Sequence, residues 1–537
     1  MFVQPLTPVA DSLALSALTA LLPLVLLFIL LGGIRMAAHR AALVALALAL
    51  LVSVSVFHMP VVQAISGAAQ GAVFGLFPIL WIVINALWVY HMTVYTGHFD
   101  VLRRSFSRIS DDPRIQGVIV AFCFGGLIEA LAGFGAPVAI SSVMLVALGF
   151  PPVRAAVVAL VANTAPVAFG AMGVPVITLA KITGLPLHEL SSTVGRQTPL
   201  LAMFVPLLLV MLIDGKRGLR ETWMPALLSG GAFAIGQFFT SNYISTELTD
   251  IVASLAGALV LILLPRRKTD PKVRQEVLTG EASLDDSSKT DAAGEVVRAY
   301  VPYAVIILIF AMAQLPALRE LLSSGNVSFH WPLLDVMTAS GKPASGNVFS
   351  MPLVATGGTL VALSGFITAI ILRIPAGQAL SEWGSTVYKI RFPILTVMSV
   401  LALAYVMNLS GQTTSIGSWV AGTGRGLAFL SPVLGWFGVA VSGSDTSSNA
   451  LFGALQATAA QQAGLSPMLL SAANSSGGVL GKMISPQNLT IACASAKMVG
   501  QEGALLRKVL PWSLGMLAIM CVIVVLQSTP ILGWMLP

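Results

Sequence analysis

Long apolar runs, separated by short basic or polar stretches, dominate the chain. A membrane-spanning helix needs about 20 mostly apolar residues, so this pattern predicts an all-α polytopic membrane protein. The apolar runs cover about 13–32, 41–57, 71–92, 115–131, 137–150, 155–172, 199–213, 224–239, 251–264, 301–315, 353–372, 393–407 and 509–526, and residues 415–496 form a more complex region.

The basic residues predict how the chain is oriented. Lys and Arg gather in the loops 35–40, 103–114, 216–220, 266–298, 373–391 and 507–508. Stretches 1–12, 59–70 and 242–250 carry neither residue, and 317–350 carries only Arg319 and Lys342. Since basic loops face the cytoplasm, both termini are expected on the periplasmic side. The number of crossings is then even, with fourteen favoured and twelve as the alternative.

Composition excludes a soluble enzyme. Of 537 residues, 56% are hydrophobic and only 9% are charged, against about 25% charged in soluble domains. The net charge of +7 fits cytoplasmic loops beside an anionic lipid leaflet better than nucleic-acid binding. Cys123, Cys493 and Cys521 lie in apolar stretches without CxxC or Cys/His spacing, so no disulfide, metal site or cofactor is expected.

No ATP-binding or hydrolase motif of the Walker, GxSxG or HExxH type occurs. An ion gradient, of protons or sodium, is therefore the expected energy source for any uphill transport. Segment 266–298 mixes both charge signs with Ser, Thr, Gly and Asp. It is predicted to be a flexible cytoplasmic linker, or a regulatory docking segment, between an N-terminal half (1–265) and a C-terminal half (299–537).

A weak internal repeat relates the two halves. With an offset of 311 residues, Asn163, Gly170, Met172 and Pro175 match Asn474, Gly481, Met483 and Pro486. The matches are few, so chance similarity stays open. The alternative is two homologous halves, each with a broken helix or re-entrant hairpin near mid-membrane, as in many secondary transporters.

Residues 442–449 are too polar to face lipid. An Asp at the centre of a helix costs about 2.5–3.5 kcal/mol on insertion scales, while each Leu or Val returns only about 0.3–0.6. Ser444, Thr446, Ser447 and Asn449 are therefore candidate ligands of a small polar solute, and Asp445 is the first candidate for carrying a coupled proton. The alternative is a hydrogen-bonded seam between helices.

Further polar groups interrupt other apolar runs. Glu129, flanked by glycines, is the second candidate proton carrier, or else half of a structural ion pair. The pairs Asn163-Thr164 and Asn474-Ser475 occupy the repeated positions. Pro166 and Gly477-Gly478 follow them, so we expect helix breaks there whose free N–H groups suit a carboxylate. Helix packing is the alternative role.

Two cations complete the candidate site. Arg196, in VGRQTP, precedes an apolar run, and Lys482 lies in the glycine-rich sequence GGVLGKMISPQN. A guanidinium binds a carboxylate through two parallel hydrogen bonds, and an ammonium neutralises it. The alternative is that both side chains reach towards lipid headgroups.

Several motifs together resemble one family. They are EALAGFGAPVAI (129–140), NTAPVAFGAMGVPV (163–176), VGRQTP (194–199), ETWMPALLSGGAFAIGQFFTSNYI (221–244), SGSDTSSNALFGALQATAAQQ (442–462) and AANSSGGVLGKMISPQNLTIACA (472–494). The sequence resembles the L-lactate permease family, also called lactate/glycolate permeases, nearly end to end. The resemblance implies proton-coupled symport of L-lactate, glycolate and D-lactate across a bacterial inner membrane. It also implies an ion-transporter-superfamily-like fold with two inverted repeats and re-entrant hairpins.

The chemistry of the candidate residues gives a mechanistic hypothesis. Lactate is an anion, and one proton makes its uptake electroneutral. The donors expected for its carboxylate are on Asn163, Thr164, Asn474, Ser475, Arg196 and Lys482. The residues expected at its hydroxyl are Ser444, Thr446, Ser447 and Asn449. An anion channel, a membrane enzyme and a carrier of a larger dicarboxylate or gluconate remain rival interpretations.

Overall fold

A computed structural model describes the chain except residues 35, 108, 134, 265–270, 279–290, 314, 339–340, 342, 345–346 and 499. Helices make up most of it, and the predicted helical membrane fold is confirmed. The helices before the predicted linker are α1 (Leu13–Phe28), α2 (Ala38–Ser55), α3 (Val61–Phe74), α4 (Trp81–Tyr95), α5 (His98–Ser107), α6 (Pro113–Val118), α7 (Gly125–Ala132), α8 (Ala136–Ala147), α9 (Pro152–Ala162), α10 (Gly170–Thr183), α11 (Leu187–Ala202), α12 (Val205–Tyr243) and α13 (Thr249–Leu263).

The remaining helices are α14 (Pro271–Val277), α15 (Ala293–Ala313), α16 (Pro316–Ser323), α17 (Gly357–Ile371), α18 (Ala376–Lys389), α19 (Arg391–Ser410), α20 (Gln412–Ala421), α21 (Leu427–Ser442), α22 (Asp445–Gln462), α23 (Pro467–Gly481), α24 (Pro486–Ser495) and α25 (Glu502–Gln527). Short π-helical turns extend or join some of them: η1 (Ile29–Gly33), η2 (Gly75–Leu80) and η3 (Ile119–Phe124). Short 3₁₀ turns are η4 (Val167–Phe169), η6 (Gly424–Gly426), η7 (Lys482–Ile484) and η8 (Gly533–Met535).

The described residues contain nine helical segments long and apolar enough to cross a membrane, or ten if the bent pair of α9 and α10 counts as one span. The shorter helices α8, α13 and α17 are also apolar. One segment, Leu187–Tyr243, is 57 residues long, and its helical geometry breaks at Asp214, Gly215 and Thr222. These breaks flank the basic stretch predicted to separate two spans. The expected twelve to fourteen crossings, and the inverted relation of the repeats, stay predictions.

Two stretches differ from the sequence-based expectation. Residues 59–70 were expected to form a loop, but α3 begins at Val61, and its Gly67 and Gln70 are buried. Gly71 packs so closely on α19 that an added Cβ would lie 2.5 Å from the Leu401 carbonyl oxygen. This backbone contact explains why a segment with few large apolar residues is helical. Stretch 317–350 contains ordered elements instead of a plain loop.

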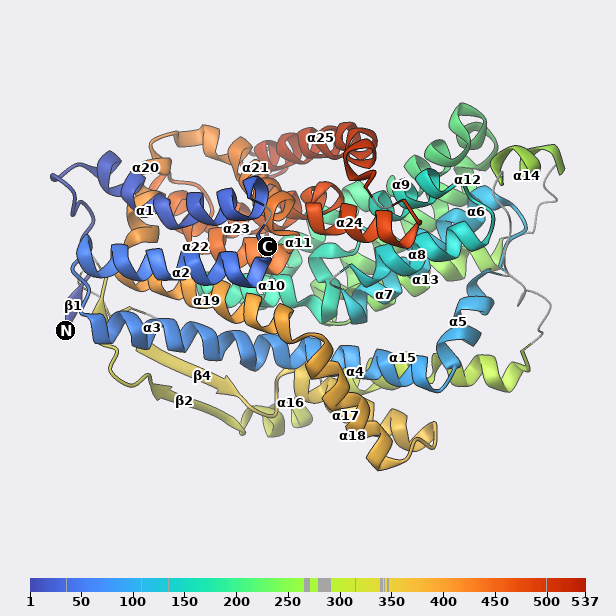
Figure 1. Ribbon diagram of the computed structural model, residues 1–537, viewed down its shortest axis with the longest axis horizontal. Coiled ribbons are helices and arrows are strands. Elements are labelled where there is room, and N and C mark those ends of the chain that lie inside the picture. The colour runs from blue at the N-terminus through green and yellow to red at the C-terminus, as the bar shows by residue number, and fades with distance from the viewer. Residues whose placement is uncertain are drawn as a thin grey trace.

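Four short strands lie near the N-terminus. β2 (Asn326–His330) and β4 (Val348–Pro352) form an antiparallel pair, and β1 (Phe2–Val3) pairs in parallel with β3 (Val336–Met337). In Figure 1, these strands lie at the same end of the molecule as the N-terminus, beside α3. The N-terminal residues therefore join a segment more than 300 residues away along the chain.

Helices from both predicted halves pack against one another. α2 and α3 contact α19, α4 contacts α17, and α10 contacts α22.

Glycines allow a close approach between α21 and α23, two helices of the C-terminal half. A Cβ on Gly435, Gly477 or Gly481 would collide with the backbone carbonyl of the facing helix. In Figure 1, the C-terminal helix α24 lies beside α8 and α9, which it contacts. The boundaries 1–265 and 299–537 stay a prediction about the sequence.

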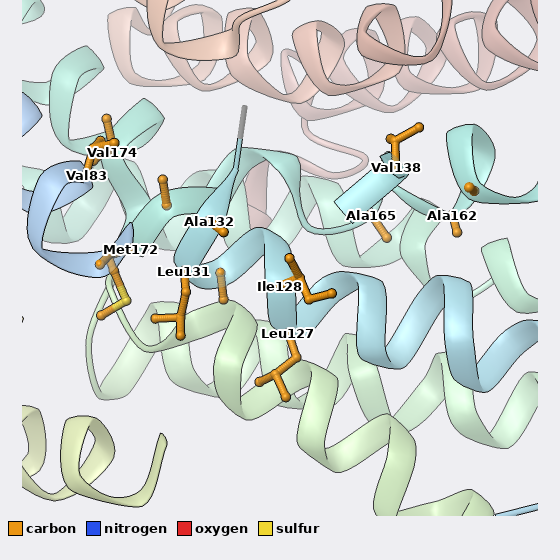
Figure 2. Close-up of a cluster of buried hydrophobic side chains, with 14 of the residues drawn as sticks. Val83, Leu127, Ile128, Leu131, Ala132, Val138, Ala162, Ala165, Met172 and Val174 are labelled. Atoms are coloured by element: carbon orange, nitrogen blue, oxygen red, sulfur yellow. The ribbon is translucent and has the colours of Figure 1, made fainter. Parts of the chain in front are cut away.

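An apolar core surrounds the broken part of the first half. Figure 2 shows Leu127, Ile128 and Leu131 of α7 together with Met172 and Val174 of the α10 segment. All five side chains are buried. Glu129 lies on the same short helix between these apolar residues. The carboxylate of Glu129 is therefore buried next to this apolar core.

The predicted linker is partly described. Within 266–298, residues 266–270 and 279–290 lie outside the described part, while α14 occupies Pro271–Val277 and α15 begins at Ala293. α14 is attached to the helix bundle: Arg217 pairs with Glu276 at 2.6 Å, and Arg154 donates to the Val277 carbonyl at 3.0 Å. Arg104 pairs with Asp291 at 2.6 Å. These contacts bind both ends of the segment to the helices.

A buried charge network stabilises the same end of the bundle. The Arg114 side chain is only 5% exposed and reaches Asp112 at 2.8 Å, Asp214 at 3.1 Å and Glu221 at 2.7 Å. Removing one partner of a buried ion pair leaves unpaired charges and costs about 3–5 kcal/mol. We therefore expect Arg114→Ala to lower the free energy of unfolding by that amount. Thermal unfolding in detergent measures this loss.

The matched control is Arg217→Ala, because the Arg217 side chain is 37% exposed. Solvent screens this pair, so the control is expected to cost no more than about 1 kcal/mol. Equal losses for the two variants would contradict the role assigned to Arg114.

Candidate functional site

Two breaks in helices occur at matching places of the internal repeat. α9 ends at Ala162, and the chain is non-helical at Ala171, Met172 and Gly173, which have φ of +45°, +61° and +72°. In the second half, α23 ends at Gly481, and the turn η7 leads to Ser485 and then to α24. Both breaks end just before the repeated prolines, Pro175 and Pro486. The expected break after Asn163 is confirmed.

The break expected at Gly477-Gly478 is wrong. These two glycines lie inside α23, and the helix ends at Gly481 instead. Their lack of a side chain serves packing. A Cβ on Gly477 would collide with the Pro432 carbonyl oxygen of α21, and a Cβ on Gly478 would collide with Asp445 Oδ1. Glycine was therefore a sign of close helix contact here and not of an interrupted helix.

Glu129 joins the two breaks. Its Oε1 accepts a hydrogen bond from Lys482 Nζ at 2.6 Å, and its Oε2 accepts one from Asn163 Nδ2 at 2.9 Å. Gly170 also lies against it, because an added Cβ would be 2.7 Å from Oε1. The Glu129 and Lys482 side chains are 3% and 7% exposed. The Glu129 carboxylate thus connects residues from both broken segments. The two segments are related by the repeat offset of 311 residues.

A second polar cluster surrounds Asp445. Gly443, at φ +76°, separates α21 from α22, and Asp445 is the first residue of α22. Asp445 Oδ2 accepts hydrogen bonds from Ser475 Oγ at 2.6 Å and Asn449 Nδ2 at 3.3 Å. All of these donors are neutral. The predicted burial of this polar segment within the protein is confirmed, since Asp445 is only 3% exposed.

Neutral side chains extend the Asp445 cluster across the helices. Asn474 Nδ2 donates to Asn449 Oδ1 at 2.8 Å, and Gln456 Nε2 donates to Asn474 Oδ1 at 2.7 Å. Asn449 Nδ2 also donates to the Pro175 carbonyl at 3.1 Å. The last contact joins the cluster to the start of the regular part of α10. It therefore reaches the first broken segment as well.

A third buried acid was not identified from the sequence. Asp250 is the second residue of α13 and is 0% exposed, although stretch 242–250 was expected to be an outer loop. Gln237 Nε2 donates to Asp250 Oδ1 at 3.1 Å and to the Ala165 carbonyl of the first break at 3.2 Å. In the sequence, an acidic residue at the edge of an apolar run looks the same as a residue of the adjoining loop. Only its contact with Gln237 reveals its position.

Lys482 is the cation shared by these acids. It pairs directly with Glu129 and lies close enough to act electrostatically on Asp250 and Asp445. One ammonium group therefore pairs with one buried carboxyl group and acts electrostatically on two more. Fully ionised, this set would have a net charge of −2. Such an excess of buried charge is costly unless protons or other cations balance it.

Several buried polar atoms at the site have no hydrogen-bond partner among the described residues. They include Asp445 Oδ1, Asp250 Oδ2, Asn163 Oδ1 and Asn488 Oδ1. All four atoms are acceptors, and unsatisfied buried acceptors are rare in native proteins. All four can accept a hydrogen bond from a water or from a hydroxyl group of a bound solute, and the two carboxyl oxygens can also take up a proton. Asn488 belongs to the second break, where its Nδ2 donates to the Lys482 carbonyl at 2.9 Å.

Four other predicted site residues are Thr164, Ser444, Thr446 and Ser447. Thr164 donates to the Val161 carbonyl at 2.7 Å, within the first break. Ser444 caps α22 by accepting from the Ser447 backbone N–H at 3.2 Å, and Thr446 is half-buried in the same turn. Ser447 is buried. These four residues therefore lie on the two segments expected to hold the solute.

Arg196 is bound elsewhere. Its guanidinium donates to Asn242 Oδ1 and to the Met535 carbonyl, both at 2.8 Å, so it attaches α11 to the C-terminal residues. The structure does not bring it to Glu129, Asp445 or Lys482. The neighbouring Gln197 lies closer, because it accepts a hydrogen bond from Ser476 Oγ of α23 at 2.7 Å. Gln197 was not singled out from the sequence.

Gly478→Ala tests the close approach of α23 to Asp445. Because the added methyl would collide with Asp445 Oδ1 and lie 2.9 Å from Val439 Cγ2, we expect a loss of about 1–3 kcal/mol in the free energy of unfolding. Gly515→Ala is the control. That helical glycine of α25 has open space around it, so alanine there should add about 0.5–1 kcal/mol. Thermal unfolding that gave both variants the same sign would refute this packing.

The described residues contain no group of three His, Cys, Asp or Glu side chains arranged to hold a metal ion. What they offer is an ammonium group, amide and hydroxyl donors, and buried carboxyl groups at two broken helices. Such an arrangement can bind a small anion and exchange protons beside it.

Comparison with known proteins agrees with this chemistry. A family model described as L-lactate permease matches residues 16–531. The L-lactate permease of Escherichia coli (strain K12) is 40% identical over 542 residues, covering 98% of each chain. The glycolate permease GlcA of the same strain is 39% identical and covers 96% of each chain. The L-lactate permease of Bacillus subtilis (strain 168) is 39% identical and covers 99% of each chain.

Among solved structures, the YdaH transporter of Alcanivorax borkumensis aligns with a TM-score of 0.46 and 16% identity, covering 87% of this chain and 88% of that one. MtrF of Neisseria gonorrhoeae aligns with a TM-score of 0.33 and 15% identity, covering 76% and 81%. The assignment rests on the sequence matches, which extend over nearly the whole length of this chain and of its relatives. The chain belongs to the L-lactate permease family, and it is therefore a multi-pass membrane transporter and not an enzyme.

Proposed function

We propose that this protein carries L-lactate, and related 2-hydroxymonocarboxylates such as glycolate and D-lactate, into the cell together with a proton. The observation that carries the proposal is the position of Glu129. It binds Lys482 of one broken segment and Asn163 of the other. The relatives named for L-lactate and for glycolate support this choice of substrate.

The charge balance of the site supports proton coupling. Among the residues that the structure describes, Lys482 is the one cation that acts on Glu129, Asp250 and Asp445. A bound lactate would add a further negative charge to a buried site, at high cost. A proton delivered to one of the carboxyl groups offsets that charge. It also makes the cycle electroneutral, which saves about 2.3 kcal/mol per 100 mV of membrane potential.

The site has the groups that a 2-hydroxymonocarboxylate requires. Lys482 has three N–H donors, so it can donate one to the substrate carboxylate while it keeps its hydrogen bond to Glu129. The unpartnered Oδ1 atoms of Asn163 and Asn488 can accept a hydrogen bond from the 2-hydroxyl group. Asp445, bound only by neutral donors, is the first choice for the coupled proton. Glu129 is the second, because it has Lys482 as counter-charge.

The proposed setting is a bacterial inner membrane with both termini on the periplasmic side. The basic loops at 103–114, 216–220 and 373–391 would then face the cytoplasm, in accord with the distribution of Lys and Arg in membrane proteins. Labelling of single cysteines placed near each terminus, in intact cells, tests this orientation.

Uptake of labelled L-lactate into proteoliposomes containing only this protein tests the proposal. We expect an inward proton gradient to drive accumulation above equilibrium and a protonophore to abolish it, with unlabelled glycolate and D-lactate competing. Conductance without accumulation would indicate a channel. Counterflow of lactate that ignores the proton gradient would indicate another coupling ion. Absence of both uptake and counterflow would exclude lactate.

A further inference from the structure

A polar cleft lies apart from the two acid clusters. It opens between α10, α19, α20, α22 and the β4 strand, at the end of the molecule that carries the N-terminus. Gln4 and Thr338, next to β1 and β3, also line it. The strand pairs at this end in Figure 1 therefore form part of its wall.

The chemistry of the cleft suits an anion. Lys181, near the end of α10, lines it together with the hydroxyl groups of Tyr405, Thr413, Thr414 and Thr458 and the amide of Asn408. None of the described residues that line it is acidic. The ion pairs formed by described residues do not include Lys181. Its ammonium group is thus available to a ligand, among neutral donors.

The cleft shares two helices with the central site. Thr458 is on α22, whose first residue is Asp445, so about 20 Å of helix separates them. Lys181 is on α10, about 9 Å along the helix from Pro175, whose carbonyl accepts the hydrogen bond of Asn449. An anion in the cleft would therefore lie over one end of the helices that hold the proposed transport site.

We propose that this cleft is a vestibular subsite, where the carboxylate of the incoming substrate binds to Lys181 before it enters the central site. The identity of the carboxylate rests on the proposed function. A cation in a recessed cleft raises the local concentration of anions and so their rate of capture. Because the subsite acts on substrate capture, it determines the KM of uptake. The central site determines the maximal rate.

Chemical modification of Thr414→Cys, a position that lines the cleft and leaves Lys181 in place, tests the subsite without requiring transport. The native cysteines Cys123, Cys493 and Cys521 are all buried, so a thiol reagent should react mainly at position 414. We expect millimolar L-lactate to slow the reaction with a negatively charged methanethiosulfonate several-fold, whereas equal chloride should not. An unchanged reaction rate in lactate would overturn the proposal, whatever the transport assay gave.

Uptake by a second variant, Lys181→Cys, gives the second readout. Lys181→Cys should raise the KM for external lactate about five- to tenfold, with a maximal rate near that of the unmodified protein. A positively charged reagent should restore the KM, and a negatively charged one should raise it further. A KM that ignores the sign of the reagent, or an equal loss of maximal rate with both reagents, would indicate a structural role for Lys181 and refute the subsite.

Arg425→Cys is the matched control. Arg425 is an exposed cation in η6 and does not line the cleft, so its modification should leave the KM unchanged. If the unmodified protein transports no lactate while lactate still protects Thr414→Cys, the subsite stands and the proposed central cycle fails. If uptake is normal and lactate gives no protection, the proposed central cycle stands and the subsite fails.

Discussion

Lys482→Gln should abolish lactate uptake and lower the free energy of unfolding by about 3–5 kcal/mol. The change removes the ammonium group that lies 2.6 Å from Glu129 Oε1 and leaves a carboxylate that is 3% exposed without its cation. It also removes the charge that would bind the substrate carboxylate. Uptake assays and thermal unfolding in detergent measure the two effects separately.

A double-mutant cycle separates stability from function. Glu129→Gln combined with Lys482→Gln removes both charges, so most of the lost stability should return, while uptake should stay absent. The coupling energy between the two sites is expected to exceed 2 kcal/mol, roughly the upper part of the range for contacting residues. Lys389→Gln, at an exposed lysine of α18, is the control and should change neither quantity. If the stability losses of the two single variants simply added up in the double variant, the pairing of Glu129 with Lys482 would be contradicted.

Asp445→Asn should abolish accumulation driven by a proton gradient while lactate exchange continues at a measurable rate. Asparagine preserves the shape and can still accept the Ser475 hydrogen bond now measured at 2.6 Å, but it cannot exchange a proton. Uptake by this variant should also lose its rise at low external pH. Gradient-driven accumulation equal to that of the unmodified protein would transfer the coupling role to Glu129 or Asp250.

Ser475→Ala is the matched control for that experiment. It removes the same hydrogen bond but keeps the carboxyl group of Asp445, so uptake should fall only severalfold and remain dependent on the proton gradient. If Ser475→Ala also uncoupled transport, the geometry around Asp445 and not its ionisation would be the cause.

The sequence predicted which residues are unusual but not which of them meet. Glu129, Asp445 and Lys482 were recognisable because a charged residue within an apolar run is costly. Their pairing was not recognisable, because Glu129 and Lys482 are 353 positions apart and periodicity says nothing about contacts over such a distance. The repeated prolines Pro175 and Pro486 came nearest to predicting where these contacts form, since both helix breaks end there.

Errors arose where one residue type serves two purposes. Gly477 and Gly478 looked like a helix break, yet they allow α23 to approach α21 and Asp445. Asp250 looked like a loop residue because it begins an apolar run, yet it is fully buried beside Gln237. Each case depends on tertiary packing that local sequence does not encode.

The most direct test of the central claim is the proton-to-lactate stoichiometry. In proteoliposomes clamped at zero membrane potential, the pH difference that just stops net lactate flux against a tenfold lactate gradient is measured. Coupling to one proton predicts that flux stops at a difference of about one pH unit, since both gradients are then worth about 1.4 kcal/mol. A flux that follows the lactate gradient alone, unaffected by the pH difference, would contradict proton symport.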